Sequence, residues 1–197
     1  MCLLDWSAVA RGNKALEYVS KPAATIAFLA VAVTLDAPHD ASRGWRIAAL
    51  VLCLAGDVFL MLPRDAFIPG LASFAVAQIL FTVSFATGDT SSGRVMVGVV
   101  LAAAAAHFLS RRFVRAMRAS GHAELVAPVV VYVVVISAMA VGAIASGNPF
   151  AIAGAVVFMA SDSLIAETRF VFARPWHAVG IMVTYHLALA GLVLALL

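Results

Sequence analysis

Long apolar stretches separated by short polar connections make up the chain from residue 22 to residue 197. A helix that crosses the hydrocarbon core of a membrane needs about 20 predominantly apolar residues. Three stretches begin at or near a proline, which suits a first helical turn because the N–H that it lacks has no helical partner there. The pattern predicts seven transmembrane helices, at residues 22–36, 44–62, 67–87, 93–110, 124–145, 149–166 and 175–197.

The connections between these stretches are short, so consecutive helices are expected to run antiparallel in an all-α bundle. Residues 1–21 differ, because Asp5, Arg11, Lys14 and Glu17 interrupt them and leave no long apolar core of a secretory signal. We therefore expect an interfacial N-terminal segment at 1–21 and a single transmembrane helical domain at 22–197.

The basic residues predict the orientation of the bundle, since cytoplasmic loops are enriched in Lys and Arg. Ten of the 13 basic residues fall on the side of the N-terminus, and three fall on the other side. The N-terminus is therefore expected in the cytoplasm and the C-terminus outside. The three on the outer side are Arg43, Arg46 and Arg94.

The composition also indicates a membrane protein rather than a soluble domain. The chain is 64% hydrophobic and 12% charged, whereas a soluble domain is about half apolar and a quarter charged. No large basic surface accompanies the apolar sequence, so no nucleic-acid partner is expected. Cys2 and Cys53 have no metal-ligand spacing, and no His-x-x-x-His pattern occurs. We expect neither metal nor cofactor. The excess of Arg over Lys, with abundant Ala and Val, favours a bacterial plasma-membrane protein.

Two carboxylates lie inside predicted spans, where an ionisable side chain is costly and so indicates function. At a rise of about 1.5 Å per residue, Asp57 lies roughly 7 Å and Asp162 roughly 6 Å from the same membrane face. Two distant segments thus bring an acid to one depth. In the alternative interpretation, each Asp is a structural hydrogen-bond acceptor that fixes helix packing.

Other polar residues fall near these acids by the same counting. Tyr132 lies in the cytoplasmic half, Gln78 and His186 lie near the midplane, and Tyr185 adjoins His186. Ser161 precedes Asp162 and is expected to orient it. Lys21 is either an anchor at the membrane surface or a cation for a lipid phosphate. The basic stretch 111–118 is expected to contact anionic membrane lipids.

The order and spacing of several short motifs resemble the YhhN/TMEM86 family of integral membrane proteins, from about residue 21 to the end. The matching residues are Lys21-Pro22, Gly56-Asp57, Leu62-Pro63, Phe67, Gly70-Leu71, Phe74, Tyr132, Ile136, Met139, Gly154-Ala155, Phe158, Ser161-Asp162, Arg169-Phe170, Met182 and Thr184-Tyr185. The family commonly has a His near Gln78 and a Tyr at the position of His186. It is usually drawn with eight spans.

The resemblance implies a lysoplasmalogenase, which hydrolyses the vinyl ether of a lysoplasmalogen to a fatty aldehyde and a glycerophospho-headgroup. Protonation of the β-carbon of an enol ether needs an acid, and the resulting cation needs an anion or an activated water. Glycosidases divide two carboxyl groups between comparable roles. We therefore expect Asp57 and Asp162 to be the catalytic pair. The expected substrate-binding residues are Lys21, Gln78, Tyr132, Ser161, Tyr185 and His186.

Two other functions remain open from the sequence. In a proton-coupled transporter of small molecules or lipids, the same two Asp residues would relay protons. In a non-catalytic lipid-binding protein, they would only hold helices together. The sequence does not indicate the headgroup preference, the oligomeric state, or which Asp is the acid.

Overall fold

The computed structural model describes residues 1–35, 40–64 and 66–197, and these residues are helical apart from short connections. Seven helices, α2 to α8, are long and apolar enough to cross a membrane, which confirms the predicted all-α fold and the number of spans. The elements are α1 (Cys2–Ala10), α2 (Lys14–Thr34), α3 (Asp40–Met61), α4 (Phe67–Ala86), α5 (Ser92–Ala119), a 3-10 turn at Ala123–Leu125, α6 (Val126–Ser146), α7 (Pro149–Phe170) and α8 (His177–Leu194).

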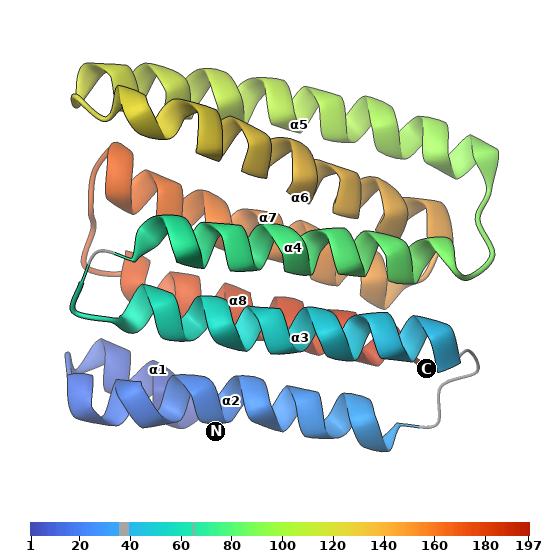
Figure 1. The fold of residues 1–197 in the computed structure, drawn as a ribbon, viewed down its shortest axis with the longest axis horizontal. Coiled ribbons are helices and arrows are strands. Elements are labelled where there is room, and N and C mark those ends of the chain that lie inside the picture. The colour runs from blue at the N-terminus through green and yellow to red at the C-terminus, as the bar shows by residue number, and fades with distance from the viewer. Residues whose placement is uncertain (36–39, 65) are drawn as a thin grey trace.

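The seven long helices alternate in direction along the chain, as short connections require (Figure 1). Helices α5 and α6 form one edge of the bundle, and α2 with the short α1 forms the opposite edge. Helices α3, α4, α7 and α8 lie between them, with α4 packed on α3 and α6 and with α7 packed on α8. The largest cluster of buried apolar side chains, which includes Phe81, Phe158 and Leu189, fills this middle part.

Local side chains explain where several helices begin and end. Helix α7 begins at Pro149 as predicted, because the side chain of Asn148 accepts hydrogen bonds from the first free backbone N–H groups. Helix α2 begins at Lys14 rather than at residue 22, because Asn13 caps it through the N–H of Leu16. The predicted boundary at residue 21 therefore falls inside a continuous helix.

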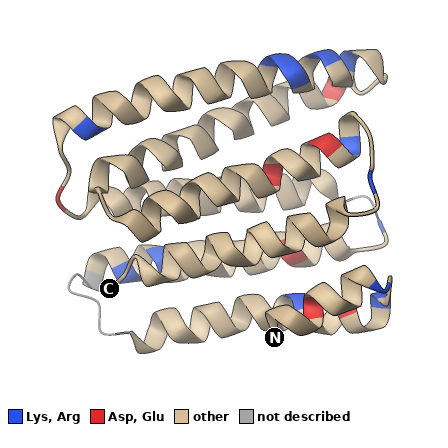
Figure 2. Ribbon diagram, turned by 180° about the vertical axis from the view of Figure 1, so that it is seen from behind, with Lys and Arg blue, Asp and Glu red and all other residues tan. Residues whose placement is uncertain are grey.

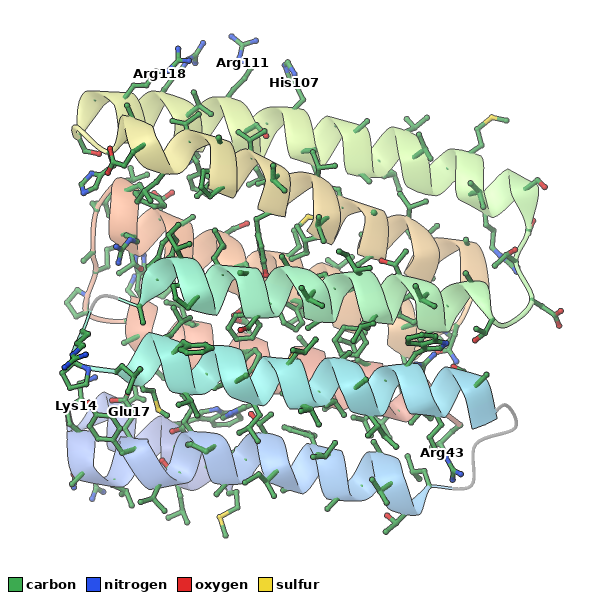
Figure 3. All side chains as sticks on the ribbon, viewed as in Figure 1. Lys14, Glu17, Arg43, His107, Arg111 and Arg118 are labelled. Atoms are coloured by element: carbon green, nitrogen blue, oxygen red, sulfur yellow. The ribbon has the colours of Figure 1, made fainter. Side chains whose placement is uncertain are left out.

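Helix α5 continues to Ala119, beyond the predicted end at residue 110. The extension is amphipathic: Phe113 and Met117 are buried, whereas Arg111 and Arg118 are exposed. Figure 3 shows Arg111 and Arg118 pointing away from the bundle. Average hydropathy falls in such a segment although the helix persists, because one apolar face is enough to hold it against its neighbours.

The first helix packs against the bundle instead of lying only on its surface. Helix α1 contacts α2 and α8, and its residues Asp5 and Ala8 are fully buried. Figure 1 shows α1 beside the first part of α2. Whether residues 1–21 lie at a membrane surface stays a prediction, but α1 belongs to the same packed unit as the spans.

Helices α7 and α8 approach each other closely at two glycines. A Cβ atom on Gly154 would lie 2.8 Å from the backbone nitrogen of Leu192, and one on Gly191 would lie 2.9 Å from Cα of Gly154. Small residues let helix backbones meet in this way within membranes. The contact fixes α7, which carries Asp162, relative to α8, which carries Tyr185.

The basic residues divide between the two ends of the bundle (Figure 2). Arg43, Arg46 and Arg94 lie at the end where α3 and α5 begin, and most other Lys and Arg residues lie toward the opposite end. The asymmetry predicted along the sequence is therefore an asymmetry between the ends of the helices. Which end faces the cytoplasm stays a prediction.

Candidate active site

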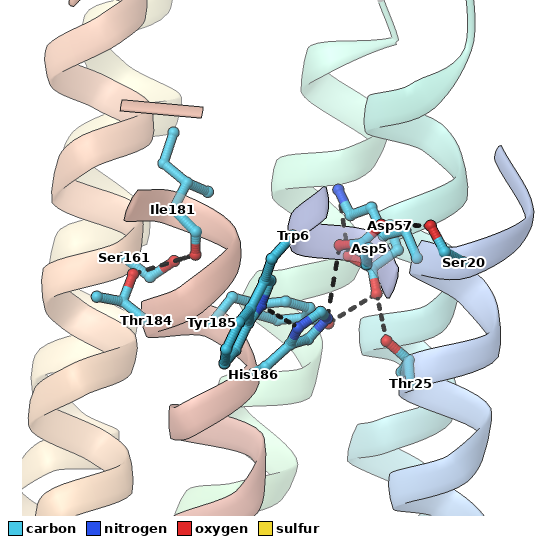
Figure 4. A network of polar contacts seen from close by, with 11 residues as sticks. Asp5, Trp6, Ser20, Thr25, Asp57, Ser161, Ile181, Thr184, Tyr185 and His186 are labelled. Carbon is cyan, nitrogen blue, oxygen red and sulfur yellow. Dashed lines mark hydrogen bonds and ion pairs between the residues drawn. The ribbon is translucent and has the colours of Figure 1, made fainter. Parts of the chain in front are cut away.

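Asp57 lies in the interior, where α2, α3 and α8 meet (Figure 4). Its side chain is 1% exposed, and its Oδ2 accepts hydrogen bonds from the hydroxyls of Thr25 at 2.7 Å and Tyr185 at 2.8 Å. The ammonium nitrogen of Lys21 lies 3.5 Å from Oδ1. A buried carboxylate is stable only when it is paired and hydrogen-bonded, and this one has both kinds of partner.

Asp162 lies on α7 and has a different environment. The hydroxyl of Tyr132, on α6, donates a hydrogen bond to its Oδ2. Both side chains line an apolar cavity with about 600 Å³ of empty space, including its open mouth. The part of this space that a water-sized sphere can enter is about 60 Å³, so the cavity is narrow. The other lining residues are mostly apolar and include Leu60, Phe67, Leu71, Phe74, Phe113, Val129, Ile136, Met159 and Phe170.

Aromatic rings connect the surroundings of the two acids. The ring of Tyr185 contacts those of Phe74 and Phe158 edge-on, with centroids 5.9 Å and 5.7 Å away. Phe74 also lines the apolar cavity, and Phe158 precedes Asp162 by one helical turn. Within the described chain no hydrogen bond joins the two carboxylates. Each acid is instead held by its own tyrosine.

Gln78 is one of the buried polar residues whose side chain has no hydrogen-bond partner in the described part of the chain. It is fully buried on α4, and neither atom of its amide has a hydrogen-bond partner within the described part of the chain. Buried amides are nearly always hydrogen-bonded in native proteins. A donor and an acceptor are thus available to a polar group or a water inside the bundle.

Ser161 and Lys21 make contacts other than those expected. The hydroxyl of Ser161 donates to the carbonyl of Ile181 at 3.1 Å, so it ties α7 to α8 and does not orient Asp162. Lys21 is 9% exposed, and its ammonium group faces Asp57 instead of an open phosphate site.

His186 belongs to a second polar cluster, formed with α1 (Figure 4). Its Nδ1 accepts a 2.9 Å hydrogen bond from the indole of Trp6, and its Nε2 lies 3.9 Å from Oδ2 of Asp5. Ser20 donates to Oδ1 of Asp5 at 2.8 Å. Burial raises the pKa of the Asp5 carboxyl, and the hydrogen bond from Ser20 opposes that effect. This cluster adjoins the first, because Ser20 precedes Lys21 and His186 follows Tyr185.

Sequence reasoning missed several of these residues, among them Thr25, Asp5 and Trp6. Thr25 is one turn after Lys21 on the same helix, so the two side chains share a face. This spacing from the Lys-Pro motif could have indicated that Thr25 lies near the site. Asp5 and Trp6 were assigned to a surface segment because charged residues surround them. Only their packing against α2 and α8 shows that they are interior.

The described residues contain no group of three or more His, Cys, Asp or Glu side chains placed to hold a metal ion. The functional groups at this site include two carboxyl groups, two phenolic hydroxyls, the hydroxyl of Thr25, one ammonium group and one amide.

Comparison with known proteins shows which family the chain is related to. Residues 16–196 match the sequence model of the YhhN family. A protein from Mycobacterium tuberculosis named lysoplasmalogenase is 34% identical over 170 residues, which are 82% of this chain and 64% of that protein. Human lysoplasmalogenase TMEM86B is 31% identical over 140 residues, which are 71% of this chain and 58% of the human protein. The chain thus spans somewhat less than two thirds of the length of these relatives. No solved structure matches it.

The match covers the helices that carry both acids, both tyrosines, Lys21, Thr25 and Gln78. On this evidence the chain is a membrane-type helical protein that belongs to the YhhN family.

Proposed function

We propose that the protein is a lysoplasmalogenase-like hydrolase that cleaves the vinyl-ether bond of lysoplasmalogens inside the membrane. One observation carries the proposal: each of two interior carboxyl groups accepts a hydrogen bond from a tyrosine, and one of these pairs opens on an apolar cavity. Relatives named lysoplasmalogenase, at 34% and 31% identity, support the same substrate class.

The two acids have different charge environments, and we assign their roles accordingly. A buried charge requires an opposite charge nearby, and Lys21 supplies one to Asp57. Asp57 is thus the carboxylate of the pair. Asp162 lies in an apolar cavity, and within the described chain no Lys or Arg forms an ion pair with it. Asp162 is the group that holds a proton and delivers it.

The reaction then proceeds in three steps. Asp162 transfers its proton to the β-carbon of the vinyl ether, and the ether oxygen stabilises the neighbouring cation as an oxocarbenium ion. Water then adds to the α-carbon, which bears the ether oxygen, and its proton passes to a carboxylate of the pair. The resulting hemiacetal releases the glycerol oxygen as an alcohol and leaves the aldehyde. The negative charge of Asp57, held by Lys21, Thr25 and Tyr185, stabilises the cation or accepts the proton of the water.

The lining of the cavity suits the hydrocarbon tail of the substrate. Its walls are mostly aliphatic and aromatic, and its polar lining residues are Tyr132, Asp162 and Ser163. Arg169 lies over the ring of Phe67, 4.2 Å from its centroid, and brings positive charge to the end of the cavity formed by Phe67 and Phe170. We place the headgroup phosphate toward this basic end and the tail along the cavity.

The remaining predicted residues have supporting roles in this proposal. The unpartnered amide of Gln78 binds the attacking water or the ether oxygen. His186 acts on Tyr185 through the packing of α8 and α1. The protein would be a multi-pass component of a bacterial plasma membrane, with the basic end of the bundle in the cytoplasm.

Aldehyde release by the purified protein tests the proposal. The protein in neutral detergent is incubated with a lysoplasmalogen, and the fatty aldehyde is measured by mass spectrometry. An enzyme forms aldehyde in proportion to protein and time. A proton-coupled transporter forms none but moves lipid or solute when reconstituted in vesicles under a pH gradient, and a non-catalytic lipid-binding protein does neither.

A further inference from the structure

A second charged group is buried at the opposite end of the bundle from the acids. Arg46, on α3, is 5% exposed. Its Nε donates to the hydroxyl of Ser84 at 2.7 Å, its Nη1 donates to the carbonyl of Leu192 at 3.2 Å, and its guanidinium carbon lies 5.2 Å from the centre of the Phe85 ring. All three partners are neutral.

The charge of Arg46 has no counter-charge among the described residues. No carboxylate of the described chain lies within ion-pair distance of its guanidinium, whereas Arg112 pairs with Glu167. An unpaired buried charge costs several kcal/mol per ion in real proteins. Charges inside membrane spans that persist despite this cost usually mark a ligand or an ion path.

A polar pocket opens beside this side chain. It contains about 720 Å³ of empty space, including its open mouth. Its polar lining residues include Ser42, Arg46, Ser84, Ser146 and Asn148, and its apolar ones are Phe85, Ala195, Leu196 and Leu197. Hydroxyl and amide groups therefore face the cavity together with the guanidinium. Asp89 also lines the pocket, but its side chain is exposed and makes no ion pair with Arg46. The tail cavity beside Asp162 has almost no such groups.

We propose that this pocket binds an oxyanion of the phosphate type, with Arg46 as its counter-charge. A guanidinium presents parallel N–H donors that match two phosphate oxygens, and its bonds to them are charge-assisted. Ser42, whose hydroxyl lies 3.1 Å from that of Ser84, and Asn148, whose amide nitrogen lies 3.5 Å from the carbonyl oxygen of Ala195, also line the pocket. The pocket lies where α3 begins and where α4 and α8 end, so it opens at the end of the bundle.

The site is separate from the proposed active site. Asp57 lies toward the other end of the same helix, about 16 Å along its axis from Arg46 at 1.5 Å per residue. The ligand is therefore not the vinyl ether under hydrolysis. Its phosphate comes either from a membrane lipid headgroup or from a free phosphate in solution.

Binding of two probes tests the site. The protein in neutral detergent is mixed with phosphatidylglycerol, and retained lipid is counted by native mass spectrometry, with diacylglycerol as the phosphate-free control. Inorganic phosphate is titrated in parallel, and its effect on the unfolding temperature and on lipid retention is measured. We expect retention of phosphatidylglycerol but not of diacylglycerol, and we expect inorganic phosphate to compete. Phosphate binding without lipid retention assigns the site to a free anion.

Variants decide whether Arg46 is responsible. Arg46→Gln should weaken binding about tenfold or more, since it removes charge-assisted hydrogen bonds. Arg94→Gln, which removes an exposed charge at the same end, should leave binding unchanged. Asp89→Asn should keep or strengthen it, because a negative charge leaves the rim. If Arg46→Gln does not fold, Arg46→Lys and Ser42→Ala replace it, each with weaker binding expected. Equal binding by wild type and these Arg46 and Ser42 variants, or no binding of either probe, overturns the proposal.

Discussion

The hydroxyl of Tyr185 donates a 2.8 Å hydrogen bond to Oδ2 of Asp57, although 128 positions separate the two residues along the chain. Tyr132 donates to Asp162 in the same manner, 30 positions away. The first pair joins α3 to α8, and the second joins α6 to α7. A phenol that holds a carboxyl oxygen leaves the other oxygen free for proton transfer or for a cation, and the predictions below depend on this arrangement.

Replacing either acid by its amide should remove most of the activity. A well-placed general acid contributes about 10²–10⁴-fold to a rate, so Asp162→Asn is expected to lower aldehyde release by that factor, and Asp57→Asn by a similar one. The matched control is Glu124→Gln, at an exposed position outside the site. Circular dichroism should show that each variant keeps its helices. Near-normal turnover in either Asp variant would refute the paired-carboxyl mechanism.

The two tyrosines should differ in importance. Thr25 still donates to Asp57 when Tyr185 loses its hydroxyl, whereas Tyr132 is the donor that the described residues provide to Asp162. Removing one partner of a buried polar group costs about 1–3 kcal/mol. We expect Tyr132→Phe to lower turnover more than Tyr185→Phe. Steady-state aldehyde assays compare the two, and a larger loss in Tyr185→Phe would contradict the assignment of Asp162 as the acid.

The close crossing of α7 and α8 should not tolerate a methyl group. Gly154→Ala places a Cβ atom 2.8 Å from the backbone nitrogen of Leu192. A backbone atom cannot relieve this clash by a change of rotamer, as a side-chain atom can. Overpacking typically costs about 1–3 kcal/mol, so the unfolding temperature and the activity should both fall. Gly44→Ala on α3 is the control, since a Cβ there meets no atom within 4 Å. Equal stability of the two variants would show that the helices separate easily.

Asp5 should make stability depend on pH in a direction opposite to that of a salt-bridged carboxylate. Burial raises the pKa of its carboxyl above the ordinary value of 3.8, so the folded protein binds this proton more tightly than the unfolded chain does. The stabilisation is complete below the unfolded pKa and is lost as the pH rises through the folded one. From about pH 4 upward, the unfolding temperature of the wild type should fall more than that of Asp5→Asn. Parallel curves for the two proteins would argue against a buried carboxyl at this position.

The mechanism also predicts which bonds resist cleavage. A saturated alkyl-ether lysolipid has no carbon that Asp162 can protonate, yet its tail and headgroup fit equally well, so we expect competitive inhibition.

In heavy water the aldehyde should carry one deuterium on the carbon next to the carbonyl. Mass spectrometry at early times, before spontaneous exchange, measures it. Aldehyde without that label, or cleavage of the saturated ether, would require different chemistry.

Several features of the fold follow from the sequence because they depend on local composition. A span must be apolar over about 20 residues, so the number of spans and their alternation were predictable without any contact. The helical rise also placed Asp57 and Asp162 near one end of the bundle. Hydropathy did not predict the end of α5. The last part of this helix has a polar average hydropathy, but its one buried face, with Phe113 and Met117, packs against the bundle and keeps it helical.

The partners of each side chain were decided only by the tertiary structure. Whether Asp57 meets Tyr185, or His186 meets Trp6, depends on the rotation of each helix about its axis and on the distance between helices. Contacts such as that between Gly154 and Gly191 set both quantities. Hydropathy does not specify that rotation for α8, because its apolar residues surround the helix on all sides. The sequence alone therefore identified Asp57 and Asp162 as the two acids within the spans, and packing determined which groups hold them.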